Sequence, residues 1–222
     1  MLTRAKVSPL AAEFLGAAIW TYVALVLSET TAVSYFIATS VAVALGVSYM
    51  LFGWFSGAHF NPAVTFGLWT TRAISTVRGV SYIIAQLIGG LASWQLYDYF
   101  TNHTIASRTG AHTDARVWLA ELVGTAIVAV GYAAAAHKKL DSLQSALTIG
   151  ATLFVGVLVA ATASAGILNP AVALGLRSFN AAYIVGPLAG GLIGVNLYNI
   201  LFAGIWGGVR PARVVKRVKA KA

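Results

Sequence analysis

The triplet asparagine-proline-alanine occurs twice in the sequence, as Asn61-Pro62-Ala63 and as Asn169-Pro170-Ala171. Asparagine is favoured just before a helix and proline at its first position, so each triplet predicts the start of a helix. Each asparagine also carries an amide group that can donate hydrogen bonds to an oxygen atom. The chemistry that these residues could perform is therefore recognition of a small hydrogen-bond acceptor.

The elements that position these triplets are predicted to cross a membrane. Of the 222 residues, 59% are hydrophobic and 9% are charged, whereas a soluble domain carries about 25% charged residues. Several apolar stretches approach 20 residues, which as a helix spans a hydrocarbon core of about 30 Å. The first of them resembles a signal peptide, but its length and the presence of Glu13 favour a retained helix. We predict spans at 8–28, 33–53, 79–100, 117–136, 143–163 and 182–206.

Two shorter segments, 61–71 and 169–178, follow the triplets. Each is about half the length of a membrane crossing, so each predicts a half-helix that enters the membrane and turns back. The predicted fold class is thus an all-α membrane protein with six transmembrane helices and two re-entrant half-helices. All of residues 1–222 are assigned to a single domain.

An internal repeat relates the two halves of the chain. The triplets lie 108 residues apart, and Ala12-Glu13-Phe14-Leu15-Gly16 recurs as Ala120-Glu121-Leu122-Val123-Gly124 at the same spacing. The repeats cover about 8–100 and 116–206, and each holds three crossings, an odd number. The two copies therefore enter the membrane from opposite sides, and such inverted repeats typically form a midplane site from broken helices.

Facing half-helices would create a distinctive electrostatic centre. Each helix N-terminus carries about +0.5 of an elementary charge, so two facing ends disfavour cations and hydronium. A water molecule held by Asn61 and Asn169 cannot easily accept a proton from its neighbour. The extended segments before the half-helices, Gly57-Ala58-His59 and Ala165-Gly166-Ile167, are expected to present free backbone carbonyls to a wet cavity.

Three ionisable residues near these segments have two possible roles each. Glu13 and Glu121 lie in apolar helices, where an unpaired charge costs roughly 2.5–3.5 kcal/mol. They could relay protons, but their matched positions favour carboxylates that accept hydrogen bonds from the loop of their own half. His59 could gate the site by protonation or hold the first loop by hydrogen bonds.

Basic residues indicate the orientation. Six of the 15 lie in the tail 209–222, where no aromatic residues are interleaved. We therefore expect the tail to contact anionic lipid and not a nucleic acid. Cytoplasmic termini place 12 basic residues inside and three outside, as the positive-inside rule requires. We expect a multi-pass protein of the plasma membrane or the cell inner membrane, with both termini and the basic tail cytoplasmic.

The segment Ser56-Gly57-Ala58-His59-Phe60-Asn61-Pro62-Ala63-Val64-Thr65 resembles the first signature loop of the aquaporin and glycerol-facilitator family, the major intrinsic proteins. Ala12-Glu13-Phe14 and Gly186-Pro187 with Gly190-Gly191 resemble the first and sixth helices of that family. The resemblance covers about 8–206. It implies a homotetramer with one pore per subunit, passive conduction in both directions and no cofactor.

The sequence departs from the family at the outer constriction. The family usually places an arginine directly after the second triplet, where this chain has Val172. The other constriction positions fall at Val41, Val157 and Gly166, so the selectivity filter is expected to be apolar and to lack a side-chain donor. Positions that separate water channels from glycerol channels disagree: Ala173 lacks the aspartate of glycerol channels, whereas Arg177 matches their basic residue.

The leading hypothesis is a passive channel for water, with small uncharged solutes such as glycerol or ammonia also possible. An alternating-access transporter would also use inverted repeats, but it would usually need ion-coordinating groups at the midplane. A structural membrane protein with a closed pore is the third alternative, because three of the four filter positions are valines. No nucleophile, metal cluster or phosphate loop stands at a spacing that predicts an enzyme, a metal site or a cofactor.

Overall fold

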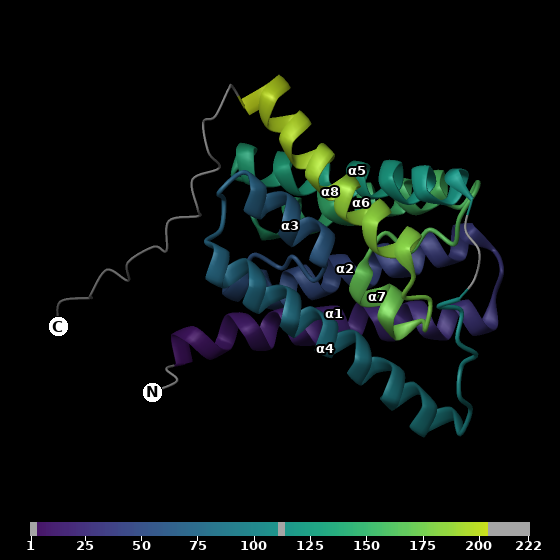
Figure 1. The fold of residues 1–222 in the computed structure, drawn as a ribbon. Helices are drawn as coiled ribbons and strands as arrows, with labels where there is room; N and C mark the ends of the chain where they lie inside the picture. The colour runs from purple at the N-terminus through teal and green to yellow at the C-terminus, as the bar shows by residue number, and fades with distance from the viewer. Residues whose placement is uncertain (1–3, 111–113, 204–222) are drawn as a thin grey trace.

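The computed structural model describes residues 4–110 and 114–203, all of whose regular elements are helical (Figure 1). The basic tail and positions 204–206 of the last predicted span lie outside the described residues. In chain order the helices are α1 (Arg4–Thr30), α2 (Ser34–Ser56), α3 (Pro62–Thr70), α4 (Thr76–Thr101), α5 (Ala115–Lys138), α6 (Ser142–Ala160), α7 (Pro170–Gly175), α8 (Ala181–Tyr198) and the π-helix η1 (Asn199–Ala203). The predicted all-α fold class is confirmed.

Five of the described helices, α1, α2, α5, α6 and α8 with its π-helical extension, are long and apolar enough to cross a membrane. The predicted span 79–100 corresponds to α4, which has 26 residues and so a length of about 39 Å. It is long enough but less apolar, because it carries polar residues such as Gln86 and Ser93, which are buried inside the protein. The predicted crossing at 79–100 is therefore present as a helix, but without the apolar stretch of the other five.

Local sequence sets several helix ends. Asp114 accepts hydrogen bonds from two backbone N–H groups at the start of α5, and Asp141 forms a capping box with Gln144 at the start of α6. The helix α2 ends at Gly57, whose φ of 92° lies in the left-handed region that favours glycine. It runs three residues beyond the predicted end at 53, so Trp54 lies in its last turn.

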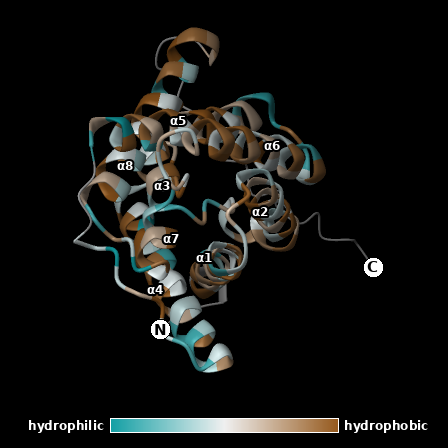
Figure 2. Ribbon diagram, turned by 90° about the vertical axis from the view of Figure 1, so that its right-hand side faces the viewer, coloured by the Kyte–Doolittle hydropathy of each residue, from teal (hydrophilic) through white to brown (hydrophobic). Residues whose placement is uncertain are grey.

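The helices form a ring that repeats the same contacts in its two halves. In the first half α1 packs against α2 and α4, and in the second half α5 packs against α6 and α8, while α2 meets α6. The half-helices contact the other repeat, since α3 packs against α8 and α7 against α4. In the end-on view, the loops that lead into α3 and α7 run inside the ring (Figure 2). The chain thus folds as an inverted repeat around two central loops.

Two glycines allow the long helices to approach the triplets. A Cβ atom added to Gly90 in α4 would lie 2.2 Å from the carbonyl oxygen of Ala171, and one added to Gly191 in α8 would lie 2.1 Å from that of Ala63. Both distances are far inside van der Waals contact. Only glycine fits at these positions, and each holds a half-helix of the opposite repeat in place.

This contact predicts that Gly191→Ala destabilises the protein by about 1–3 kcal/mol, because a methyl group would push the triplet Asn61-Pro62-Ala63 away from α8. Thermal unfolding of the purified protein in detergent measures the effect. Gly46→Ala in α2 is the matched control, since its added Cβ would lie at an ordinary 3.5 Å from Ala146. Equal unfolding temperatures for both variants and the parent protein would contradict the tight contact.

Candidate pore

The two central loops have the same backbone conformation. Ala58 and Phe60 have φ values of 52° and 51°, and their counterparts Gly166 and Leu168 have values of 65° and 57°. Three of these residues are not glycine, and the left-handed conformation costs such a residue roughly 1–2 kcal/mol. The surrounding contacts must therefore impose the conformation on both loops.

Glu13 of α1 supplies these contacts for the first loop. Its carboxylate is fully buried and accepts hydrogen bonds from the backbone N–H of His59 at 3.0 Å and of Phe60 at 2.7 Å. The Nε2 atom of Gln86 in α4 donates to the same carboxylate at 2.7 Å and to Thr65 Oγ1 at 2.9 Å. Three donors thus satisfy a buried carboxylate, which in turn fixes the shape of the loop.

Glu121 of α5 holds the second loop in the same way. Its carboxylate accepts from the backbone N–H of Ile167 at 3.0 Å and of Leu168 at 2.7 Å. Ser164 replaces the glutamine as the third donor, at 2.8 Å, and its hydroxyl accepts from the N–H of Gly166 at 3.0 Å. The proton-relay alternative receives no support from this geometry, since each carboxylate is surrounded by structural donors.

The two asparagines connect the loops to each other. The side-chain oxygen of Asn61 accepts from the N–H of Ala63 at 2.8 Å, and Nδ2 of Asn61 donates to the carbonyl of Leu168 at 2.9 Å. Asn169 repeats the pattern with the N–H of Ala171 at 2.9 Å and the carbonyl of Phe60 at 3.0 Å. These bonds orient both amides and leave each Nδ2 with a second N–H.

The half-helices that begin at the triplets differ in length. The helix α3 has nine residues, close to the ten expected, whereas α7 has six and ends at Gly175 instead of continuing to 178. Leu176 terminates it by donating back to the carbonyls of Leu174 and Val172, and Arg177 follows with a φ of 52°. The prediction for the second half-helix was therefore too long, although its N-terminal turn is intact.

The four predicted filter positions are apolar and buried. Val41, Val157 and Val172 are at most 4% exposed and belong to one hydrophobic cluster. Gly166 lies beside Val157, because a Cβ added to Gly166 would be 3.3 Å from Val157 Cγ1. Nη1 of Arg177 donates to the carbonyl oxygen of Ile105 at 2.6 Å, and the guanidinium lies 4.7 Å from the centre of the Trp94 ring.

Tyr132 of α5 is a residue of this region that the sequence analysis did not identify. Its hydroxyl lies 2.8 Å from the carbonyl oxygen of Ala58 and 3.1 Å from that of His59. Those two carbonyls were expected to be free, and that expectation is wrong. The repeat gave no indication of it, because the residue 108 positions earlier is Ala24, so Tyr132 has no counterpart in the first half.

The His59 side chain is engaged within the first loop. Its Nδ1 atom lies 3.2 Å from Thr65 Oγ1, and its ring contacts the Tyr82 ring edge-on at 5.4 Å between centroids. The imidazole is 5% exposed. These contacts correspond to the loop-holding alternative for His59. Among the described residues, no group of three or more His, Asp or Glu side chains could hold a metal ion.

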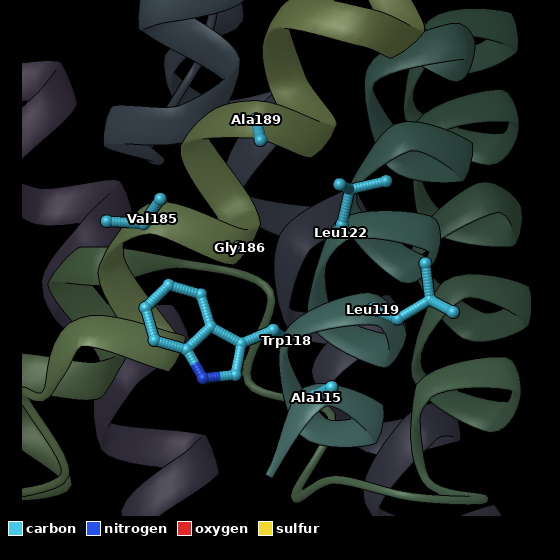
Figure 3. Close-up of a pocket in the computed structure, with 7 residues that line it drawn as sticks. All are labelled: Ala115, Trp118, Leu119, Leu122, Val185, Gly186 and Ala189. Carbon is cyan, nitrogen blue, oxygen red and sulfur yellow. The ribbon is translucent and has the colours of Figure 1, made fainter. Parts of the chain in front are cut away.

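A groove of about 550 Å³ lies apart from the two loops, between α5 and α8. Figure 3 shows its lining, which comes from these two helices: Ala115, Trp118, Leu119, Leu122, Val185, Gly186 and Ala189. Leu119 and Val185 are 60% and 49% exposed, so the groove opens on the outer face of the ring. It is an apolar surface suited to lipid and contributes no residue to the loops.

The fold and the loops together define a class of protein. Apolar helices surround two inverted loops, each loop ends in a half-helix, and the two half-helices begin at paired asparagines. This is the architecture of a polytopic membrane channel.

Comparison with known proteins identifies the family. The sequence matches the major intrinsic protein family over residues 3–198. It is 37% identical over 187 residues to aquaporin TIP2-1 of Arabidopsis thaliana, covering 78% of this chain and 72% of that protein. It is 31% identical over 193 residues to aquaporin Z of Photorhabdus laumondii, with 76% and 84% covered. The chain belongs to the major intrinsic protein family, and it is an integral membrane protein.

A solved structure of the same architecture supports the fold. The aquaglyceroporin from Plasmodium falciparum superposes with a TM-score of 0.73, covering 88% of this chain and 96% of that one. The sequence identity is 19%, so the similarity concerns the arrangement of helices and half-helices. The family resemblance predicted from the signature loop is confirmed.

Proposed function

We propose that the protein is a passive channel for water and for small uncharged solutes such as glycerol or ammonia. The observation that carries this proposal is the reciprocal bonding of the two asparagines to the opposite loops. It presents one N–H of Asn61 and one of Asn169 at the junction of the loops. Those two donors can bind the oxygen of a passing molecule and release it, since neither supplies a charge or a covalent bond.

Exclusion of ions follows from the same centre. The N-termini of α3 and α7 begin at the triplets, and each carries a partial positive charge that disfavours cations. A water molecule that accepts from both asparagines has its hydrogen atoms turned outward, which interrupts a chain of proton transfers. With Val172 in place of the arginine, this exclusion rests on the half-helix ends and on Asn61 and Asn169.

The outer filter that we propose consists of Val41, Val157, Gly166 and Val172. Its apolar side chains would give solutes no donor and would not impose the narrow polar passage that an arginine creates. This composition favours passage of solutes larger than water. The names of the aligned aquaporins support water as one permeant.

Assembly and orientation are part of the same proposal. Large apolar side chains are exposed on the surfaces of α2 and α6, including Val43, Val47 and Leu147, where lipid or a second subunit would cover them. We infer a homotetramer in the plasma membrane or the cell inner membrane, with cytoplasmic termini. Arg72 and Arg78 would then lie on the inner side, and Arg108, Arg116 and Arg177 on the outer side.

Osmotic swelling and shrinkage of proteoliposomes tests the function. We expect vesicles that contain the protein to shrink faster than empty vesicles in a sucrose gradient, and to re-swell faster in a glycerol gradient. The measurement is stopped-flow light scattering at matched protein content. Rates equal to those of empty vesicles for both solutes would refute the channel. Saturable uptake that requires an ion gradient would instead identify an alternating-access transporter.

A further inference from the structure

The first loop is contacted by a tyrosine that the proposed filter positions do not account for. Tyr132 lies in α5 and is 4% exposed. Its hydroxyl is within hydrogen-bond distance of the carbonyl oxygens of Ala58 and His59, at 2.8 and 3.1 Å. The hydroxyl has one hydrogen, which it can donate to one of the two carbonyl oxygens at a time or share between them. Tyr132 therefore occupies acceptors that a permeating molecule would otherwise use.

The hydrogen bonds of the first loop show from which side the Tyr132 side chain approaches it. The N–H groups of His59 and Phe60 point to Glu13 of α1, so one face of the loop is held from that side. The carbonyls of Ala58 and His59 instead meet a side chain of α5. We propose that the path runs along this carbonyl face. The Tyr132 side chain reaches the face from α5.

The surroundings of Tyr132 are apolar. It belongs to the same hydrophobic cluster as Leu45 of α2, Val128 of α5, and Ile149 and Leu153 of α6. The cluster also contains Ala58 and Phe60 of the first loop. Tyr132 thus lies in an apolar cluster that extends from α2, α5 and α6 to the first loop, and its hydroxyl bonds that loop.

The second loop lacks such a contact. Within the described residues, no side chain donates to the carbonyl oxygens of Gly166 or Ile167, which correspond by the repeat to Ala58 and His59. The position that corresponds to Tyr132 in the first half holds Ala24, with a side chain of one carbon atom. The two halves of the path are therefore unequal, with valines at the outer filter and a hydrogen-bonded tyrosine at the inner loop.

We propose that Tyr132 forms an inner constriction that selects among permeants, by placing its ring across the path and its hydroxyl on the carbonyls of Ala58 and His59. This proposal rests on the proposed channel function. A molecule must displace the hydroxyl, or pass beside it, before it reaches Asn61 and Asn169 from the inner side. Water has the size and the donors to do so, and bulkier solutes are slowed at this point.

Three substitutions test the constriction in proteoliposomes. Tyr132→Phe removes the hydroxyl and keeps the aromatic ring. Tyr132→Ala introduces the residue that the other repeat has at the corresponding position, Ala24. We expect Tyr132→Ala to raise water and glycerol permeability by about threefold or more and Tyr132→Phe to give a smaller rise. Tyr132→Cys adds a unique thiol to a chain without cysteine, and a small thiol reagent should abolish its flux. Tyr99, which is 80% exposed on α4, provides Tyr99→Ala and Tyr99→Cys as controls that should match the parent protein.

The outcomes separate this proposal from the channel function itself. If the parent protein conducts, and folded Tyr132→Ala shows no rise while labelled Tyr132→Cys keeps its flux, the constriction is refuted and the channel stands. If the parent protein does not conduct but Tyr132→Ala does, Tyr132 closes the path and the open-channel proposal fails alone. If neither conducts although both elute as folded protein, both proposals fail. A fall in permeability of folded Tyr132→Ala would also contradict the constriction.

Discussion

Replacement of Glu13 by alanine is expected to lower thermal stability sharply and to abolish conduction. The substitution leaves the backbone N–H groups of His59 and Phe60 without their acceptor in a fully buried region. Each unsatisfied buried donor costs about 1–3 kcal/mol, so the two together cost roughly 2–6 kcal/mol. The first loop would lose the bonds that impose its left-handed residues, and Asn61 would lose its position.

Two further variants make this prediction specific. Glu13→Gln keeps one acceptor oxygen and the volume of the side chain, so its unfolding temperature should fall between those of Glu13→Ala and the parent protein. Glu29→Ala lies on the same helix, where Glu29 is exposed, and should behave as the parent protein does. Glu121→Ala should reproduce the loss through the second loop. A conducting Glu13→Ala protein with unchanged unfolding temperature would show that the loop keeps its shape without the carboxylate.

Symmetry explains why much of this fold could be predicted from the sequence. The matched spacing of Glu13 and Glu121 with the two triplets required two copies of one structural unit, and each glutamate does accept bonds from the loop 46 and 47 residues further on. Helix positions followed from the length of apolar stretches, as for α5 and α6. The span 79–100 was predicted in the same way, and α4 lies there although its buried polar residues Gln86 and Ser93 lower its hydropathy.

The parts that could not be predicted are those where a side chain acts across the repeat. Tyr132 contacts a loop more than 70 residues away, and no local pattern marks that pairing. Arg177 matches the basic residue of glycerol channels, and no motif predicted that its guanidinium donates to the carbonyl oxygen of Ile105 in the loop between α4 and α5. The early end of α7 likewise depends on backbone bonds that close a turn at Arg177. Hydropathy and motif spacing contain none of this information.

The unequal halves of the path suggest where selection occurs. An arginine at the outer filter would combine a positive charge, hydrogen-bond donors and bulk. Val172 supplies neither the charge nor the donors. On the proposed inner side, the hydroxyl of Tyr132 bonds the carbonyl oxygens of Ala58 and His59 instead. We therefore expect outer substitutions to affect mainly which solutes enter, and substitutions at Tyr132 to raise the permeability to water and, more strongly, to solutes bulkier than water.

Introduction of an arginine at Val172 is expected to reduce glycerol permeability by about tenfold or more, which corresponds to an added barrier of about 1.4 kcal/mol. Val172 is 2% exposed and shares its cluster with Val41 and Val157, so a longer side chain must enter the space of the proposed filter. Water, being smaller, should be slowed less. The glycerol-to-water permeability ratio in proteoliposomes measures the effect independently of the amount of protein inserted.

Val172→Met separates bulk from charge, because methionine lengthens the side chain without adding a positive charge. Both variants should lower the glycerol-to-water ratio, whereas only Val172→Arg should lower proton leakage, measured with a pH-sensitive dye inside the vesicles. The arginine has an insertion cost of roughly 2.5–3.5 kcal/mol if its guanidinium finds no acceptors, so elution of both variants must first match the parent protein. Unchanged glycerol flux in a folded Val172→Arg protein would place the outer filter elsewhere. The selecting element would then be on the inner side, where Tyr132 lies.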